Sequence, residues 1–141
     1  MTAEVDMNAA AVPAPRAGKA VVAGRVISGL AILFLIFDGV IKLPPMAEVI
    51  TTLQQLGYPA TPTLARGLGV LSLLCTLLYA IPRTSVIGAI LLTGLLGGAI
   101  ATHLRAQSPV FSHLLFGVYI GAMVWGGLYL RNARLRALLW S

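Results

Sequence analysis

A few ionisable side chains interrupt a chain that is otherwise strongly apolar. Asp38 and Lys42 are four residues apart, so a helix places them on one face, where carboxylate and ammonium can pair. Burying either charge alone in hydrocarbon costs at least ~2.5 to 3.5 kcal/mol, and an unpaired aspartate there takes up a proton or attracts a cation. Such a pair can orient the polar head of a ligand or transfer a proton, with Asp38 as the candidate catalytic acid.

Other polar residues lie at the ends of three later apolar stretches. Arg66 opens one stretch, Thr102 and Arg105 close the next, and His113 lies near the start of the last. Because successive helices of a hairpin-joined bundle alternate in direction, these positions and the Asp38–Lys42 pair fall at one end. We therefore predict one ligand-binding cluster at that end, formed by Asp38, Lys42, Arg66, Thr102, Arg105 and His113.

A purely structural interpretation of the same residues stays open. Lys42, Arg66 and Arg105 can extend their charged groups to lipid headgroups, while Asp38 neutralises one of them. His103 lies two residues before Arg105, so a helix turns only one of the two toward the bundle interior. The histidines lack the paired spacing of a zinc site, and no metal centre is predicted.

Four long apolar stretches must position these residues. The chain is 58% hydrophobic and 10% charged, with a mean hydropathy of +0.92, whereas soluble domains carry roughly 25% charged residues. Each stretch approaches the ~20 residues that cross ~30 Å of hydrocarbon. The predicted fold is all-α, an integral membrane four-helix bundle with helices at about 25–43, 64–81, 85–102 and 111–130.

The segments outside these stretches complete the predicted organisation. Residues 1–22 are rich in Ala and Pro near their start and are predicted to be a disordered cytoplasmic tail, which leaves 23–141 as one domain. Residues 46–62 predict a short interfacial helix followed by a turn. Because lipid provides no hydrophobic force between helices, we expect their contacts to use the small residues of Gly94–Ala101 and the GxxxG pair Gly117 and Gly121.

The basic residues predict the orientation and the partner. Lysine and arginine lie at the ends of apolar stretches and do not gather on one face, so the bilayer is the predicted partner and nucleic acid is not. On this topology seven basic residues lie on the side of the termini and three on the other, which predicts both termini in the cytoplasm. The seven are Arg16, Lys19, Arg25, Arg83, Arg131, Arg134 and Arg136, and the three are Lys42, Arg66 and Arg105.

Several short segments, in order along about four-fifths of the chain, carry a family resemblance. They are Phe37–Leu43 (FDGVIKL), Leu56–Pro59 (LGYP), Leu78–Thr84 (LYAIPRT), Gly88–Gly94 with Gly97–Arg105, and Trp125–Arg131 (WGGLYLR). From Gly29 to its carboxyl end the chain resembles the DoxX-like family, small four-helix bacterial membrane proteins of the wider DoxX group. The family pattern often has a glutamate where this chain has Ser72, so any activity that needs that acid is not expected here.

The resemblance implies a multi-pass protein of the bacterial inner membrane. DoxX relatives are linked to membrane redox systems, including subunits of thiosulfate:quinone oxidoreductase, although most DoxX-like members have no assigned activity. It therefore implies a small-ligand or quinone-binding accessory of a membrane redox partner, while the sequence itself requires no cofactor. Two alternatives stay open: an acid–base enzyme of isomerase or cyclase type acting on a lipophilic substrate through Asp38, and a membrane scaffold or assembly factor.

Overall fold

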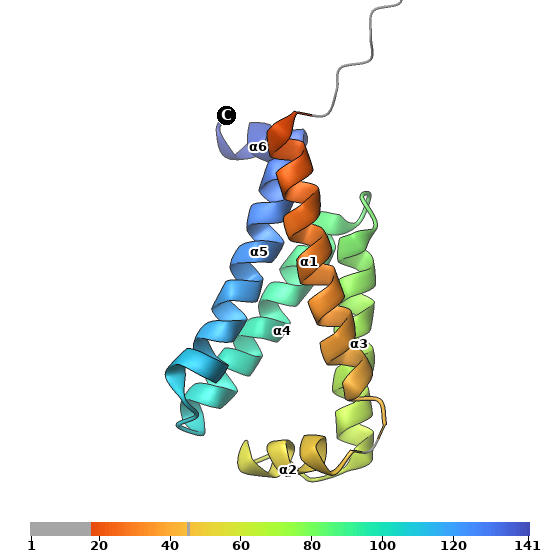
Figure 1. The fold of residues 1–141 in the computed structure, drawn as a ribbon, viewed down its shortest axis with the longest axis vertical. Coiled ribbons are helices and arrows are strands. Elements are labelled where there is room, and N and C mark those ends of the chain that lie inside the picture. The colour runs from red at the N-terminus through yellow and green to blue at the C-terminus, as the bar shows by residue number, and fades with distance from the viewer. Residues whose placement is uncertain (1–17, 45) are drawn as a thin grey trace, which may run out of the picture.

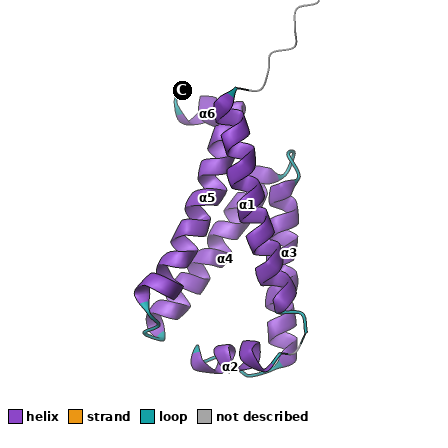
Figure 2. Ribbon diagram, in the orientation of Figure 1, coloured by secondary structure: helices purple, strands orange, loops and turns teal. Residues whose placement is uncertain are grey.

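The described part of the chain is helical throughout. The computed structural model describes residues 18–44 and 46–141, and within them it contains no strand (Figures 1 and 2). Four helices are long and apolar enough to span a membrane, so the predicted all-α class and the four spans are confirmed. The elements are α1 (Lys19–Ile41), α2 (Ala47–Gln55), α3 (Pro62–Ala80), α4 (Ser85–Arg105), the π-helical turn η1 (Val110–Leu114), α5 (Leu115–Arg131) and α6 (Ala133–Leu139).

The four spans form a bundle whose helices are closely packed at one end, here called the tight end, and diverge at the other, here called the open end. Helix α1 packs on α3 and α5, and α4 packs on the same two helices from the opposite side. In Figure 1 the spans lie close together where α6 lies, and the α1–α3 pair diverges from the α4–α5 pair toward α2. Burial agrees with this shape, because the buried residues of α4 are confined to Ser85–Leu92 and those of α5 to Ile120–Leu128.

The helix ends differ from the predicted bounds by a few residues. Helix α1 starts at Lys19, so the part of the predicted tail that reaches residue 22 is wrong, while residues 1–17 lie outside the described part. Helix α4 likewise continues to Arg105. The extension of α4 adds His103 and Arg105, which suit the headgroup region, whereas the extension of α1 is apolar apart from Lys19. At α3 the start is fixed locally, since Thr61 Oγ1 accepts a hydrogen bond from the Leu64 N–H and Pro62 occupies the first turn.

A buried tyrosine joins three helices at the tight end. Tyr79 of α3 is fully buried, and its hydroxyl donates to the Val124 carbonyl of α5 at 2.8 Å. Because that proton is committed, the Ser28 hydroxyl of α1 donates to the Tyr79 oxygen at 2.9 Å. Arg131 lies over the Tyr79 ring, 5.0 Å from its centroid, and donates to the Tyr79 carbonyl at 3.1 Å. We call Tyr79, Ser28, Arg131 and the Val124 carbonyl the Tyr79 cluster.

Only some of the small residues predicted to lie at helix contacts are found there. A Cβ added at Gly117 would lie 2.8 Å from Ile100, so this glycine of the GxxxG pair does allow α5 to approach α4. Gly94, Gly97 and Gly98 have no neighbouring atom within 4 Å of an added Cβ, and all three are exposed within the chain. The predicted role of this α4 face in packing the bundle is wrong, because α4 turns its other side, with Leu96 and Ile100, to α5.

We predict that Gly127→Ala destabilises the bundle, because α1 and α5 cross there at close range. The added Cβ would lie 2.5 Å from Ser28 Oγ and 2.9 Å from the Ser28 backbone nitrogen, and overpacking of this kind costs about 1–3 kcal/mol. Thermal unfolding of the purified protein in detergent measures the effect. The matched control is Gly126→Ala, which meets no atom within 4 Å and should leave the melting temperature unchanged or slightly raised. Equal melting temperatures for the two variants would contradict the proposed crossing.

Candidate ligand site at the open end

Helix α2 lies across the open end and is held to α4 by two hydrogen bonds. Arg105 Nη2 donates to the Leu56 carbonyl at 2.9 Å. The Thr102 hydroxyl donates to the Gly98 carbonyl within α4, so its oxygen accepts the Tyr58 hydroxyl proton at 3.0 Å. We call these two bonds, Arg105 to Leu56 and Tyr58 to Thr102, the α2–α4 bridge.

The turn that follows α2 positions the Leu56 carbonyl and the Tyr58 hydroxyl, the two groups that form hydrogen bonds with α4. Gly57 has φ +79°, a left-handed conformation that glycine adopts without steric cost. Its N–H donates to the Gln54 carbonyl and the Tyr58 N–H donates to the Leu53 carbonyl, both at 2.9 Å. This is the Schellman pattern of a helix C-terminus, and it turns the Leu56 carbonyl and the Tyr58 ring toward α4.

The other end of α2 is tied to α1 and α3. Arg66 Nε, near the start of α3, donates to the Leu43 carbonyl at 3.1 Å and so holds the connection that leaves α1. Leu53 of α2 is buried, with 6% of its surface exposed, and α2 packs on α3. Helix α2 therefore connects the two diverging helix pairs.

The Asp38–Lys42 pair lies on the inward face of α1. Asp38 follows Leu35 by three residues and Ala31 by seven, and these two are 2% and 0% exposed. On the same face, however, the side chains of Asp38 and Lys42 are 34% and 28% exposed. The carboxylate and the ammonium form a direct ion pair, as the spacing predicts. Side chains on this face of α1 are thus buried at Leu35 and partly exposed one to two turns later, at the charged pair.

Glycine allows α3 to approach this pair closely. A Cβ added at Gly69 of α3 would lie 2.7 Å from the Gly39 carbonyl and 3.1 Å from the Lys42 Cβ. One turn further along α3, Ser72 is 3% exposed, and within residues 18–44 and 46–141 its hydroxyl has no hydrogen-bond partner. An unsatisfied buried hydroxyl costs about 1–3 kcal/mol, so Ser72 is a strained polar group in the packed part of the α1–α3 contact.

The two histidines face each other at the α4–α5 connection. The rings of His103 and His113 lie 5.3 Å apart, centroid to centroid. His103 Nδ1 pairs with Ser108 Oγ at 3.1 Å, and His113 Nδ1 with Ser112 Oγ at 2.7 Å. Since Arg105 is directed to α2 and His103 to His113, the two side chains diverge as their spacing predicts. Among the described residues no group of three His, Cys, Asp or Glu side chains is placed to hold a metal ion.

The six predicted site residues occupy one end of the bundle in separate groups. Asp38 pairs with Lys42, Arg66 binds the end of α1, Thr102 and Arg105 bind α2, and His113 lies beside His103. In the part of the chain that the structure describes, no hydrogen bond or ion pair joins the Asp38–Lys42 pair to α4. Neither Tyr58 nor the Leu56 carbonyl was predicted to take part in the site, although the Leu56–Pro59 segment carries part of the family resemblance.

Four helices long and apolar enough to span a membrane define a polytopic α-helical membrane protein. Residues 26–127 match the DoxX-like family, and the chain belongs to that family. The resemblance drawn from the short sequence segments is thereby confirmed. No curated protein and no solved structure matches the chain.

We predict that breaking the α2–α4 bridge frees α2 locally without unfolding the spans. Arg105→Ala removes the donor to Leu56, and Tyr58→Phe removes the hydroxyl bound to Thr102. Each bond contributes about 0.5–1.5 kcal/mol, more for the charged donor, so the double variant should exchange amide hydrogens in residues 47–58 about tenfold faster. Hydrogen–deuterium exchange with mass spectrometry measures this.

The matched control for the α2–α4 bridge is the double variant Arg83→Ala with Tyr119→Phe. Both residues are exposed and lie away from α2. Unchanged exchange in α2 for the bridge variant, or an equal increase for the control, would show that the two bonds do not hold α2.

Proposed function

We propose that this DoxX-like protein binds a small lipophilic molecule with a polar head in the open end of the bundle, behind α2. The observation that supports it is the exposure of the Asp38–Lys42 pair. These side chains share a face with Leu35, which is 2% exposed, yet they are 34% and 28% exposed themselves. A charged pair on the inward face of a membrane span is a functional-site candidate, because hydrocarbon opposes its placement there.

The chemistry of the walls favours a head group that accepts hydrogen bonds. On α1 the Lys42 ammonium has donors beyond the one used by Asp38. Tyr58 and Arg105 add polar groups from the α2–α4 bridge. The diverging helix pairs are apolar outside this zone, so an isoprenoid or acyl tail can extend into lipid.

A quinone is the ligand class that this arrangement fits best. Its two carbonyl oxygens accept hydrogen bonds and its prenyl tail suits the bilayer, while bound quinone would supply the capacity to carry electrons. Asp38 holds and orients Lys42, and Lys42 donates to the head. In this proposal the protein is an accessory of a membrane redox partner in the bacterial inner membrane, with both termini in the cytoplasm.

The acid–base alternative has less support from the geometry. A proton-donating Asp38 would have to leave its ion pair with Lys42, and the freed ammonium would then need a new partner within the bundle. The pair is better suited to hold a head group than to release a proton.

We predict that Asp38→Asn weakens binding of a short-chain ubiquinone analogue about tenfold. Removing the carboxylate leaves Lys42 without its partner, so the donor that meets the head group loses its position; a charge-assisted hydrogen bond contributes about 1.5–3 kcal/mol. Binding is measured by titration of the purified full chain in lipid nanodiscs.

The matched control is Glu48→Gln, which neutralises the other described carboxylate side chain, exposed on α2 at the same end. Its affinity should equal that of the unmodified chain. Melting temperatures of both variants separate loss of the site from loss of the fold. Saturable binding that Asp38→Asn leaves intact, or no saturable binding by the unmodified chain, would overturn the proposal.

A further inference from the structure

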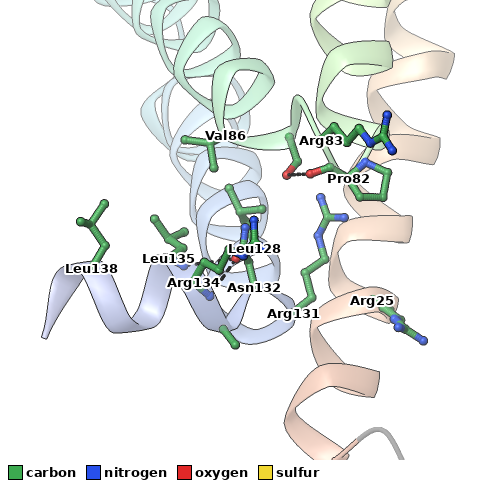
Figure 3. A pocket seen from close by; sticks show the side chains of 12 residues that line it. Arg25, Pro82, Arg83, Val86, Leu128, Arg131, Asn132, Arg134, Leu135 and Leu138 are labelled. Atoms are coloured by element: carbon green, nitrogen blue, oxygen red, sulfur yellow. Dashed lines mark hydrogen bonds between the residues drawn. The ribbon is translucent and has the colours of Figure 1, made fainter. Parts of the chain in front are cut away.

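A cavity of about 710 Å³ lies at the opposite, tight end of the bundle. It is bounded by the start of α1, the turn between α3 and α4, the end of α5, and α6 (Figure 3). Four arginines line it: Arg25, Arg83, Arg131 and Arg134. The remaining lining includes leucines of α5 and α6 and a valine of α4. A basic, partly apolar cavity of this size is suited to an amphiphile with a negative head.

The described residues supply no carboxylate side chain to these arginines. The two acidic residues of the described part, Asp38 and Glu48, lie on α1 and α2 toward the other end. In Figure 3 Arg131 extends from α5 toward Pro82, whereas Arg25 leaves α1 with its guanidinium pointing away from Arg131. Arg83 and Arg134 approach the cavity from the α3–α4 turn and from α6.

Arg131 carries a buried donor without a described acceptor. Its Nη2 donates to the Tyr79 carbonyl at 3.1 Å, but its Nε is inaccessible and has no hydrogen-bond partner within the described residues. Buried donors of charged groups are almost always paired, because leaving one unpaired is costly. Because this nitrogen is enclosed by the protein, a ligand in the cavity meets the remaining N–H groups of Arg131, which lines it.

Helix α6 places the cavity at the level of lipid headgroups. It runs across the end of α5 and lies crosswise to α1 in Figure 3. Leu138, Leu139 and Trp140 are 74%, 62% and 79% exposed, and the Trp140 indole N–H donates to the Tyr129 hydroxyl at 2.8 Å. Exposed leucines and a hydrogen-bonded tryptophan beside basic residues are typical of a helix lying in the membrane interface.

We propose that this cavity binds the headgroup of an anionic phospholipid. The phosphodiester oxygens accept hydrogen bonds from Arg83, Arg131 and Arg134, and the acyl chains lie along the leucines of α5 and α6. Arginine donors suit phosphate because the planar guanidinium presents two N–H groups side by side. Basic cavities at the headgroup level between membrane helices bind anionic lipids on the same principle. The site is separate from the quinone site proposed at the open end.

Native mass spectrometry of the detergent-solubilised full chain tests the proposal. We expect one phosphatidylglycerol to bind saturably and more tightly than phosphatidylcholine. Arg83→Gln and Arg134→Gln should each weaken phosphatidylglycerol binding about fivefold, the loss expected for one basic residue near an anionic lipid. Lys19→Gln is the matched control, because Lys19 is a cation at the same end that does not line the cavity, and it should bind as the unmodified chain does.

Three results would overturn the lipid site. Equal affinities for the two lipids would show that the arginines do not select charge. An equal loss in Lys19→Gln would show a diffuse surface effect. Binding of inorganic phosphate without preference for phosphatidylglycerol would assign the cavity to a free anion. A Glu4→Gln/Asp6→Asn variant tests whether the preceding segment fills the cavity, since phosphatidylglycerol binding seen only in that variant would also count against the proposal.

Discussion

The hydroxyl of Tyr79 is the interaction on which the architecture depends. In lipid no hydrophobic force draws helices together, so close packing and buried hydrogen bonds must hold them. The Tyr79 cluster provides both at one level, because the phenol of α3 binds the Ser28 hydroxyl of α1 and the Val124 carbonyl of α5. Arg131 adds its guanidinium over the same ring. Three of the four spans are thereby fixed at the end where both described chain ends lie.

Toward the opposite end the helix pairs diverge, and among the described residues no buried hydrogen-bond cluster like that of Tyr79 joins them; Phe34 of α1 and Phe116 of α5 meet edge to face, 4.7 Å between ring centroids. The buried residues of α4 stop at Leu92, and beyond them its small-residue face at Gly94, Gly97 and Gly98 has no neighbour. Helix α2 compensates by lying across the gap, with Arg66 at one side and the α2–α4 bridge at the other. The chain thus keeps ionisable residues on an inward face without sealing them, an arrangement that a protein built only for rigidity would not need.

Much of the fold and part of the candidate site follow from the sequence for identifiable reasons. The four spans can be predicted from the sequence because crossing hydrocarbon requires long apolar runs. The Asp38–Lys42 pair can be predicted because a four-residue spacing aligns two side chains on one face of a helix. The α2–α4 bridge could not be predicted from the sequence, because its partners are far apart along the chain. Tyr58 and Thr102 are separated by 44 residues, and Arg105 binds a backbone carbonyl 49 residues before it. The exposure of the α4 glycines was also missed, because small residues show that close approach is permitted without showing which helix approaches.

Arg131 takes part in both the Tyr79 cluster and the lining of the arginine-lined cavity. One side chain therefore serves both the packing of the helices and the proposed binding of a ligand. Its hydrogen bond from Nη2 and its contact with the Tyr79 ring help to hold the bundle, and the same side chain lines the cavity. An anion that binds this guanidinium in the folded chain alone would stabilise the folded state by mass action. On the proposed lipid site, the thermodynamic stability of this protein would depend on the composition of the surrounding bilayer as well as on its own side chains.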